Sequence, residues 1–291
     1  MIAPGSAPKL VASDVDGTLI NSSERVPQRL RDVITRMTNQ GVTLALSTGR
    51  PPRWIHYVLD QLSVKPICVC ANGAVLYDSA ADEILAAQTL SPEVMASAVM
   101  AARAALEEHG GVSIAAERAG KSAYDPADEL FLVTPEYSHA WPSNDHGTFE
   151  EAEVLSEPAT KLLMRSDYLD SKQLFDIVRA SVPEDQVHVT FSMSGGLIEI
   201  AAPGVTKALG VSMLAERLKI EQKDVITFGD MPNDIEMLQC DGQRPTRGQS
   251  SIRPHYRHQR RRRCSRCIGV VVLEGSCKTL LGGPIRAKIR P

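Results

Sequence analysis

The sequence predicts an α/β protein in which a doubly wound parallel sheet is interrupted by an inserted α+β domain. Strand and helix signals alternate over residues 10–77, and this alternation resumes over residues 207–234. Such βαβα order is typical of a parallel sheet with helices on both faces. The segment between them contains a hairpin signal, which is typical of an α+β unit. At 291 residues the chain is long enough for two domains.

The first part of the predicted sheet begins with the apolar run Leu10-Val11-Ala12. Pro27 occupies a first helical position, and apolar residues then recur at helical spacing until Gly41 ends the helix. The later elements of this part are predicted as a strand over 42–47, a helix over 51–62, a buried strand over 66–72 and a short strand over 74–77.

The middle of the chain begins with a long Ala-rich helix that Ser91-Pro92 opens and that runs to His109. Two strands joined across Ser194-Gly195-Gly196 form the hairpin signal. The elements predicted here and beyond are strands over 112–116, 130–134, 161–165, 187–193, 197–201 and 225–228, and helices over 172–181, over 207–218 and from Asn233. We therefore predict a core of residues 1–84 and 203–240, a cap domain of residues 85–202 and a separate tail of residues 241–291.

Composition is that of an ordinary soluble protein, with 43% hydrophobic residues and few aromatic ones. No apolar run reaches the length of a membrane span, and the start lacks the layout of a signal peptide. We expect a cytoplasmic protein that does not bind membranes and is a monomer or a homodimer. Cys68 and Cys70 lie in an apolar run and are predicted to be buried thiols.

Two aspartates directly follow the first strand, in the segment Asp14-Val15-Asp16-Gly17-Thr18. If the extended backbone reaches Asp16, both side chains face one site at the carboxyl end of the strand, where open α/β sheets bind ligands. Two close carboxylates repel each other, so the arrangement suggests a cation. An EF-hand is excluded because its sixth and twelfth positions would be Leu19 and Arg25.

Three further segments follow predicted strand ends or open a helix: Ser47-Thr48-Gly49-Arg50, the lone Lys207, and Gly229-Asp230-Met231-Pro232-Asn233-Asp234. Taken singly, each is typical of a helix cap or a solvated charge. All four in order resemble the motifs of the phosphatases of the haloacid-dehalogenase-like superfamily. About 160 residues separate Ser47 from Lys207, which is similar to the Cof-like branch with its large α+β cap. Asn72-Gly73-Ala74 also resembles that branch.

This resemblance implies a Mg²⁺-dependent phosphatase that hydrolyses small phosphate esters, such as a sugar phosphate or a phosphorylated cofactor, through an aspartyl-phosphate. Asp14 would be the nucleophile, Asp16 the general acid and base, and Lys207 the cation that neutralises the phosphoryl oxygens. The metal ligands would be Asp14, the backbone carbonyl of Asp16 and Asp230, with Asp234 acting through water or Asn233.

The same resemblance implies a phosphate- and substrate-binding set. Arg50 could reach the substrate or pair with a core acid, and Asn72 could line the pocket or steady Asp16. The predicted set is Gly17, Thr18, Ser47, Thr48, Gly49, Arg50, Asn72 and Asn233.

The last part of the chain departs from the family pattern and reverses the charge balance. Residues 1–238 carry 19 basic and 33 acidic residues, whereas residues 239–291 carry 13 basic and 2 acidic ones. The basic tail could bind nucleic acid, which would make the protein a catalytically weak binding protein. It could bind zinc through His255, His258, Cys264 and Cys267, although the pairs are too closely spaced for an ordinary zinc finger. The interpretation we favour is a translated frameshift.

Overall fold

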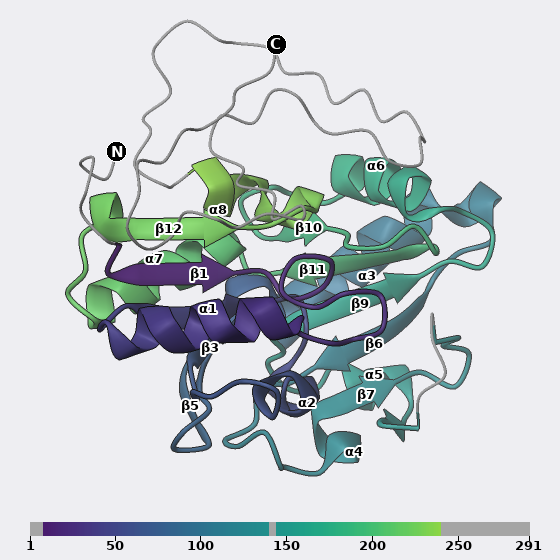
Figure 1. Cartoon of the computed structure of the whole chain (residues 1–291). Coiled ribbons are helices and arrows are strands. Elements are labelled where there is room, and N and C mark those ends of the chain that lie inside the picture. Colours follow the sequence, from purple (N-terminus) through teal and green to yellow (C-terminus); the bar gives the residue numbers. More distant parts are fainter. Residues whose placement is uncertain (1–7, 140–143, 240–291) are drawn as a thin grey trace, which may run out of the picture.

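The computed structural model describes residues 8–139 and 144–239, which form two six-stranded sheets with helices packed against them (Figure 1). The predictions about the basic tail lie outside the described residues. The strands of the first sheet come from both ends of the described chain, whereas those of the second come from its middle. The second sheet is therefore an insertion into the first, as the sequence predicts.

The first sheet is the predicted doubly wound sheet, with strand order β12-β1-β2-β3-β4-β5. Its four parallel strands are β1 (Leu10–Ser13), β2 (Thr43–Ser47), β3 (Ile67–Cys70) and β12 (Val225–Phe228). Two antiparallel strands, β4 (Val75–Asp78) and β5 (Glu83–Ala87), complete it. Strand β5 was not predicted, and the boundary predicted after residue 84 falls inside it.

Helices cover both faces of this sheet because successive strand residues point to opposite sides. On one face Leu44 and Leu46 pack in a core with α1 (Gln28–Asn39) and α2 (His56–Leu59), whereas Ala45 packs in a separate core with α7 (Lys207–Arg217) and α8 (Ile235–Gln239). Figure 1 shows α1 and α7 on opposite sides of β1. The helix predicted over 51–62 is shorter, being a 3₁₀ turn η1 (Pro52–Trp54) followed by α2.

The second sheet is the α+β cap, with order β10-β11-β9-β6-β7-β8, and only the β7–β8 pair is parallel. The predicted hairpin is present, since His188 pairs with Ala201. Its strands are β6 (Ser113–Glu117), β7 (Phe131–Val133), β8 (Gly147–Thr148), β9 (Lys161–Arg165), β10 (His188–Thr190) and β11 (Leu197–Ala201). Its helices are α3 (Pro92–Ala105), α4 (Ala127–Leu130), α5 (Glu151–Val154) and α6 (Ser171–Ser181).

Four more 3₁₀ turns lie in the connections: η2 (Ala71–Gly73), η3 (Glu107–His109), η4 (Gln222–Asp224) and η5 (Pro232–Asp234). Turns η2 and η5 follow β3 and β12 at the carboxyl edge of the first sheet, so they border the same region as the end of β1. The chain therefore leaves β3 and β12 here through tight turns rather than long loops.

Gly73 in η2 lets the backbone of this turn lie very close to the start of α7 (Lys207–Arg217). Its φ is +100°, and a Cβ built on it would lie 2.0 Å from the carbonyl oxygen of Thr206, the N-cap residue of α7. We expect Gly73→Ala to lower the free energy of unfolding by about 3 kcal/mol, because it adds backbone strain to a main-chain clash. Urea unfolding measures this loss, and Gly41→Ala, where φ is +84° but no atom lies within 4 Å, isolates the strain. Equal losses in both variants would exclude the clash.

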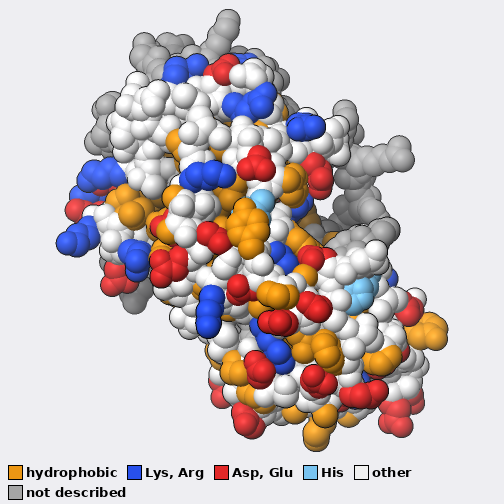
Figure 2. Space-filling view, turned by 90° about the horizontal axis from the view of Figure 1, so that it is seen from below, with side chains coloured by type: hydrophobic (Ala, Val, Ile, Leu, Met, Phe, Trp, Pro, Cys, Tyr) orange, Lys and Arg blue, Asp and Glu red, His pale blue; other side chains and the backbone are white. Residues whose placement is uncertain are grey.

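The described surface mixes both signs of charge. Figure 2 shows one face on which acidic and basic side chains are interspersed with apolar ones. Within residues 8–139 and 144–239, no helix combines the length and the apolar character needed to cross a membrane. Cys68 and Cys70 are buried and form no disulfide within the described residues, and burial raises the pKa of the Cys70 thiol to about 12, so both act as packing residues.

Candidate active site

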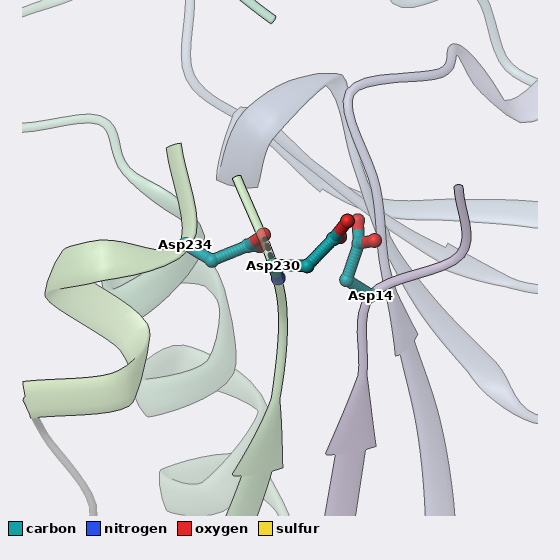
Figure 3. A group of neighbouring side chains, drawn as sticks. All are labelled: Asp14, Asp230 and Asp234. Carbon is teal, nitrogen blue, oxygen red and sulfur yellow. Dashed lines mark hydrogen bonds between the residues drawn. The ribbon is translucent and has the colours of Figure 1, made fainter. Parts of the chain in front are cut away.

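Three carboxylates meet where the strand order of the first sheet reverses. Strand β1 lies between β2 and β12, and ligands in open α/β sheets bind at the carboxyl ends of strands flanking such a reversal. Asp14 follows β1, and Asp230 and Asp234 follow β12 (Figure 3). One carboxylate oxygen from each lies within 4.8 Å of those of the other two. The topology of the sheet thus brings together acids that are more than 200 positions apart.

Lys207 forms ion pairs with two of these carboxylates. Its ammonium Nζ lies 2.6 Å from Asp14 Oδ1 and 2.7 Å from Asp234 Oδ1, and its side chain is 1% exposed. The lysine occupies the first turn of α7, whose N-cap Thr206 accepts a hydrogen bond from the backbone NH of Leu209. The close approach of Gly73 to Thr206 therefore also places the lysine.

The pKa values follow from this burial and crowding. Burial raises the pKa of Asp14 to about 6, helped by the charges of Asp234 and Asp230 and opposed by Lys207. Burial also raises the pKa of Asp230, against the hydrogen bond it accepts from Thr18. Burial alone would lower the pKa of Lys207, but the two carboxylates outweigh it and raise that pKa. The lysine therefore stays cationic among the acids.

Asp234 and Asp14 differ in how much hydrogen-bonding capacity they have left. Asp234 Oδ2 accepts hydrogen bonds from the backbone NH groups of Asp230 (3.0 Å) and Met231 (2.9 Å), and its Oδ1 accepts one from Lys207. Asp14 Oδ2 is buried and has no partner among the described residues. Asp234 thus fixes the loop and the lysine, whereas Asp14 retains an oxygen for chemistry or for a cation.

Asp16 lies apart from this acidic group. Strand β1 ends at Ser13 and the chain turns at Gly17, whose φ is +87°, so the extended run that would align Asp16 with Asp14 stops too early. The Asp16 carboxylate is 51% exposed and is bound by both Nε (2.8 Å) and Nη2 of Arg50. Arg50 also stacks over Tyr57 at 5.0 Å. In this structure Arg50 therefore pairs with an acid, which is one of the two roles predicted for it.

The remaining predicted binding residues border the acids with small groups and hydroxyls. Thr18 Oγ1 donates to Asp230 Oδ1 at 3.0 Å, and a Cβ on Gly17 would lie 2.6 Å from Asp230 Oδ2. Ser47 Oγ is fully buried and unpartnered among the described residues. Thr48 Oγ1 instead accepts the backbone NH of Arg50 at 3.1 Å. Ser47 is thus the hydroxyl that remains available to a ligand.

Two cap residues that the sequence did not reveal reach the core beside this site. Lys161 on β9 donates to the carbonyl oxygen of Gly49 at 2.6 Å and lies 2.9 Å from Glu199 Oε2. Glu199 on β11 accepts a hydrogen bond from Asn72 Nδ2, and Asn72 Oδ1 accepts one from Asn233 Nδ2 at 3.0 Å. The available signal was a single acid inside the apolar strand sequence Leu197-Ile198-Glu199-Ile200-Ala201.

The acidic group suits Mg²⁺. Its donors are all oxygens, which this hard cation prefers, and Asp14 Oδ2 and Asn233 Oδ1 are buried acceptors without partners in the described chain. A buried acceptor left unpaired costs free energy, so its presence points to a ligand. Both oxygens of Asp234 already accept hydrogen bonds, so Asp14 and Asp230 are the carboxylates that would hold the ion.

The fold and the site define an α/β protein with an acidic centre at the sheet's reversal point and an inserted α+β cap beside it. The chain belongs to the haloacid dehalogenase-like hydrolase family, which matches residues 11–243. This confirms the predicted resemblance and shows that the protein is an enzyme of the hydrolase class.

Two named phosphatases are similar to this chain over most of its length. The HMP-PP phosphatase of Cronobacter sakazakii is 27% identical over 236 residues, covering 80% of this chain and 82% of that protein. The 5-amino-6-(5-phospho-D-ribitylamino)uracil phosphatase YitU of Bacillus subtilis is 24% identical over 235 residues, with 81% and 84% covered. Among solved structures, a phosphatase of this superfamily from Bacteroides thetaiotaomicron superposes with a TM-score of 0.64 at 19% identity, covering 83% and 85%, which confirms the fold.

Proposed function

We propose that the protein is a Mg²⁺-dependent phosphatase that hydrolyses small phosphate esters through an aspartyl-phosphate on Asp14. The observation that carries this proposal is the buried Oδ2 of Asp14, which has no partner among the described residues and lies beside a lysine that already neutralises Oδ1. The names of the two relatives, an HMP-PP phosphatase and a 5-amino-6-(5-phospho-D-ribitylamino)uracil phosphatase, support a small phosphorylated substrate.

In the proposed reaction, Asp14 Oδ2 forms a bond to phosphorus while the ester P–O bond breaks. The leaving oxygen takes a proton from Asp16, and Asp16 later accepts a proton from the water that cleaves the acyl phosphate. Because Arg50 binds the Asp16 carboxylate in this structure, Asp16 must leave Arg50 to reach the leaving oxygen. Mg²⁺ would neutralise charge on the transferred phosphoryl group.

Lys207 and Ser47 supply the protein's own contribution to phosphoryl binding. The Lys207 ammonium lies 2.6 Å from Asp14, so it is placed to offset negative charge next to the reacting carboxylate. Ser47 Oγ is a buried donor without a partner among residues 8–139 and 144–239, and a phosphoryl oxygen would satisfy it. Both side chains are buried, Ser47 at the end of β2 and Lys207 at the start of α7.

A screen of phosphate esters with and without Mg²⁺ tests the function. It should include a sugar phosphate, flavin mononucleotide, pyridoxal phosphate and a phosphorylated pyrimidine, with inorganic phosphate as the product measured. We expect release from at least one ester that stops when the metal is chelated. Release that persists at full rate in chelator, or no release from any ester, would contradict the proposal.

Binding of Mg²⁺ should weaken at acidic pH. The pKa of Asp14 is raised by burial to about 6, so below that pH the carboxyl is increasingly protonated and a proton must leave before the cation binds. We expect the affinity to fall up to about tenfold per pH unit below pH 6, and to be nearly constant above pH 7. Calorimetry at pH 5, 6 and 7 measures this, and an affinity independent of pH would show that Asp14 does not hold the ion.

A further inference from the structure

We propose that Glu199 of the cap is a positioning residue that, acting through Asn72, fixes the Asn233 side chain so that its oxygen faces the metal site. This inference rests on the proposed function, because it concerns the Mg²⁺ site of that reaction. It assigns a role in assembling the site to a residue of the inserted domain.

Glu199 is surrounded by hydrogen-bond donors. Its Oε2 lies 2.9 Å from the ammonium of Lys161 and accepts a hydrogen bond from Asn72 Nδ2, and its Oε1 accepts one from Ser192 Oγ at 2.9 Å. The side chain is 9% exposed. An ionised carboxylate can only accept hydrogen bonds, so the amide group that faces it must present its nitrogen.

The orientation of the Asn72 amide in turn sets the orientation of the Asn233 amide. Because Asn72 turns its nitrogen to Glu199, its Oδ1 faces Asn233, and Asn233 must then donate through Nδ2, at 3.0 Å. The other polar atom of the Asn233 side chain, Oδ1, is buried and has no partner in the described chain. Asn233 lies between Asp230 and Asp234 in the sequence. An acceptor oxygen at this place suits a cation or a cation's water, whereas an amide nitrogen would not.

The relay also connects the two domains. Glu199 and Lys161 lie on cap strands β11 and β9, whereas Asn72 and Gly49, whose carbonyl oxygen Lys161 binds at 2.6 Å, lie in the core. Asn72 has a left-handed backbone (φ 56°, ψ 31°), a strained conformation that persists only where the surroundings determine it. The acceptor oxygen is thus held in place only while the cap is seated against the core.

Calorimetric titration of Mg²⁺ into Glu199→Gln tests the relay. Glutamine has the same shape but can offer either its oxygen or its nitrogen, so it no longer dictates the orientation of Asn72. We expect the Mg²⁺ dissociation constant to rise about tenfold, as for other partners that orient metal ligands. At saturating Mg²⁺, KM for the phosphate ester should stay within about twofold of the wild-type value.

Glu117→Gln is the matched control. Glu117 is also a buried cap carboxylate that binds a core cation, with its Oε2 3.1 Å from Arg53 Nη2, but within the described residues it forms no hydrogen bond with Asn72. We expect this variant to bind Mg²⁺ like the wild type. If both variants weaken Mg²⁺ binding equally, the effect comes from cap seating in general and the relay is wrong.

Asn72→Gly provides a second test that does not depend on how well Glu199→Gln folds, because glycine tolerates the left-handed backbone. It should weaken Mg²⁺ binding by a similar factor, and adding Glu199→Gln to it should change little, since residues acting through one another are not additive. Additive effects in the double variant, or wild-type affinity in either single variant, would overturn the relay. Wild-type protein that binds Mg²⁺ but releases no phosphate would contradict the proposed function and leave the relay intact.

Discussion

Asp14→Asn should abolish steady release of phosphate while leaving the fold intact. The substitution keeps the size and the polar character of the side chain but removes the carboxylate that, by our proposal, attacks phosphorus and holds the cation. We expect the rate to fall by at least about 10³-fold, as when the nucleophile of other hydrolases is removed. Phosphate release from the ester identified in the screen, followed under saturating Mg²⁺, measures the effect.

The control for this variant is Asp60→Asn. Asp60 is 73% exposed, pairs with Lys65 at 3.6 Å on the surface and is not among the residues assigned to the site, so the Asp60→Asn variant should release phosphate at the wild-type rate. Circular dichroism should show both variants folded. If folded Asp14→Asn releases phosphate at the wild-type rate, Asp14 is not the nucleophile.

Much of the fold could be predicted because its elements are separated by strong local signals. Pro27 and Gly41 bracket α1, and the Gly195-Gly196 pair marks the β10–β11 hairpin. Strands β5 and β8 were missed for different reasons. Strand β5 carries no clean alternation of apolar and polar residues, and β8 spans only two residues, Gly147–Thr148, so its pairing comes from tertiary contacts.

Only the part of the candidate site that lies at the ends of strands and helices could be predicted from the sequence. Asp14 and Asp230 follow strands of the first sheet and Lys207 begins a helix packed on that sheet, so topology brings them together. Glu199 and Lys161 instead lie within a different sheet, and their roles depend on how that sheet docks. The pairing of Asp16 with Arg50 likewise depends on the turn at Gly17, which ends the extended run before Asp16.

The removal of Lys207 should have the largest effect on stability. Lys207→Met keeps the length of the side chain but leaves Asp14 and Asp234, both buried, without the cation that lies 2.6 Å and 2.7 Å from their oxygens. Breaking a buried ion pair by removing one partner costs about 3–5 kcal/mol, because the remaining charge is uncompensated. Urea unfolding in the presence of a chelator measures this loss at pH 7.5.

Mg²⁺ should partly compensate for the missing lysine, because a divalent cation among the same carboxylates offsets their repulsion. The increase in Tm on adding Mg²⁺ should therefore be larger for Lys207→Met than for the wild type, while phosphate release stays low because the phosphoryl oxygens lose a cation. Lys223→Met, at an exposed pair with Glu221, should leave both properties unchanged. A Lys207→Met protein that unfolds like the wild type in chelator would mean that the lysine does not neutralise this acidic group, and its place between Asp14 and Asp234 would then need another explanation.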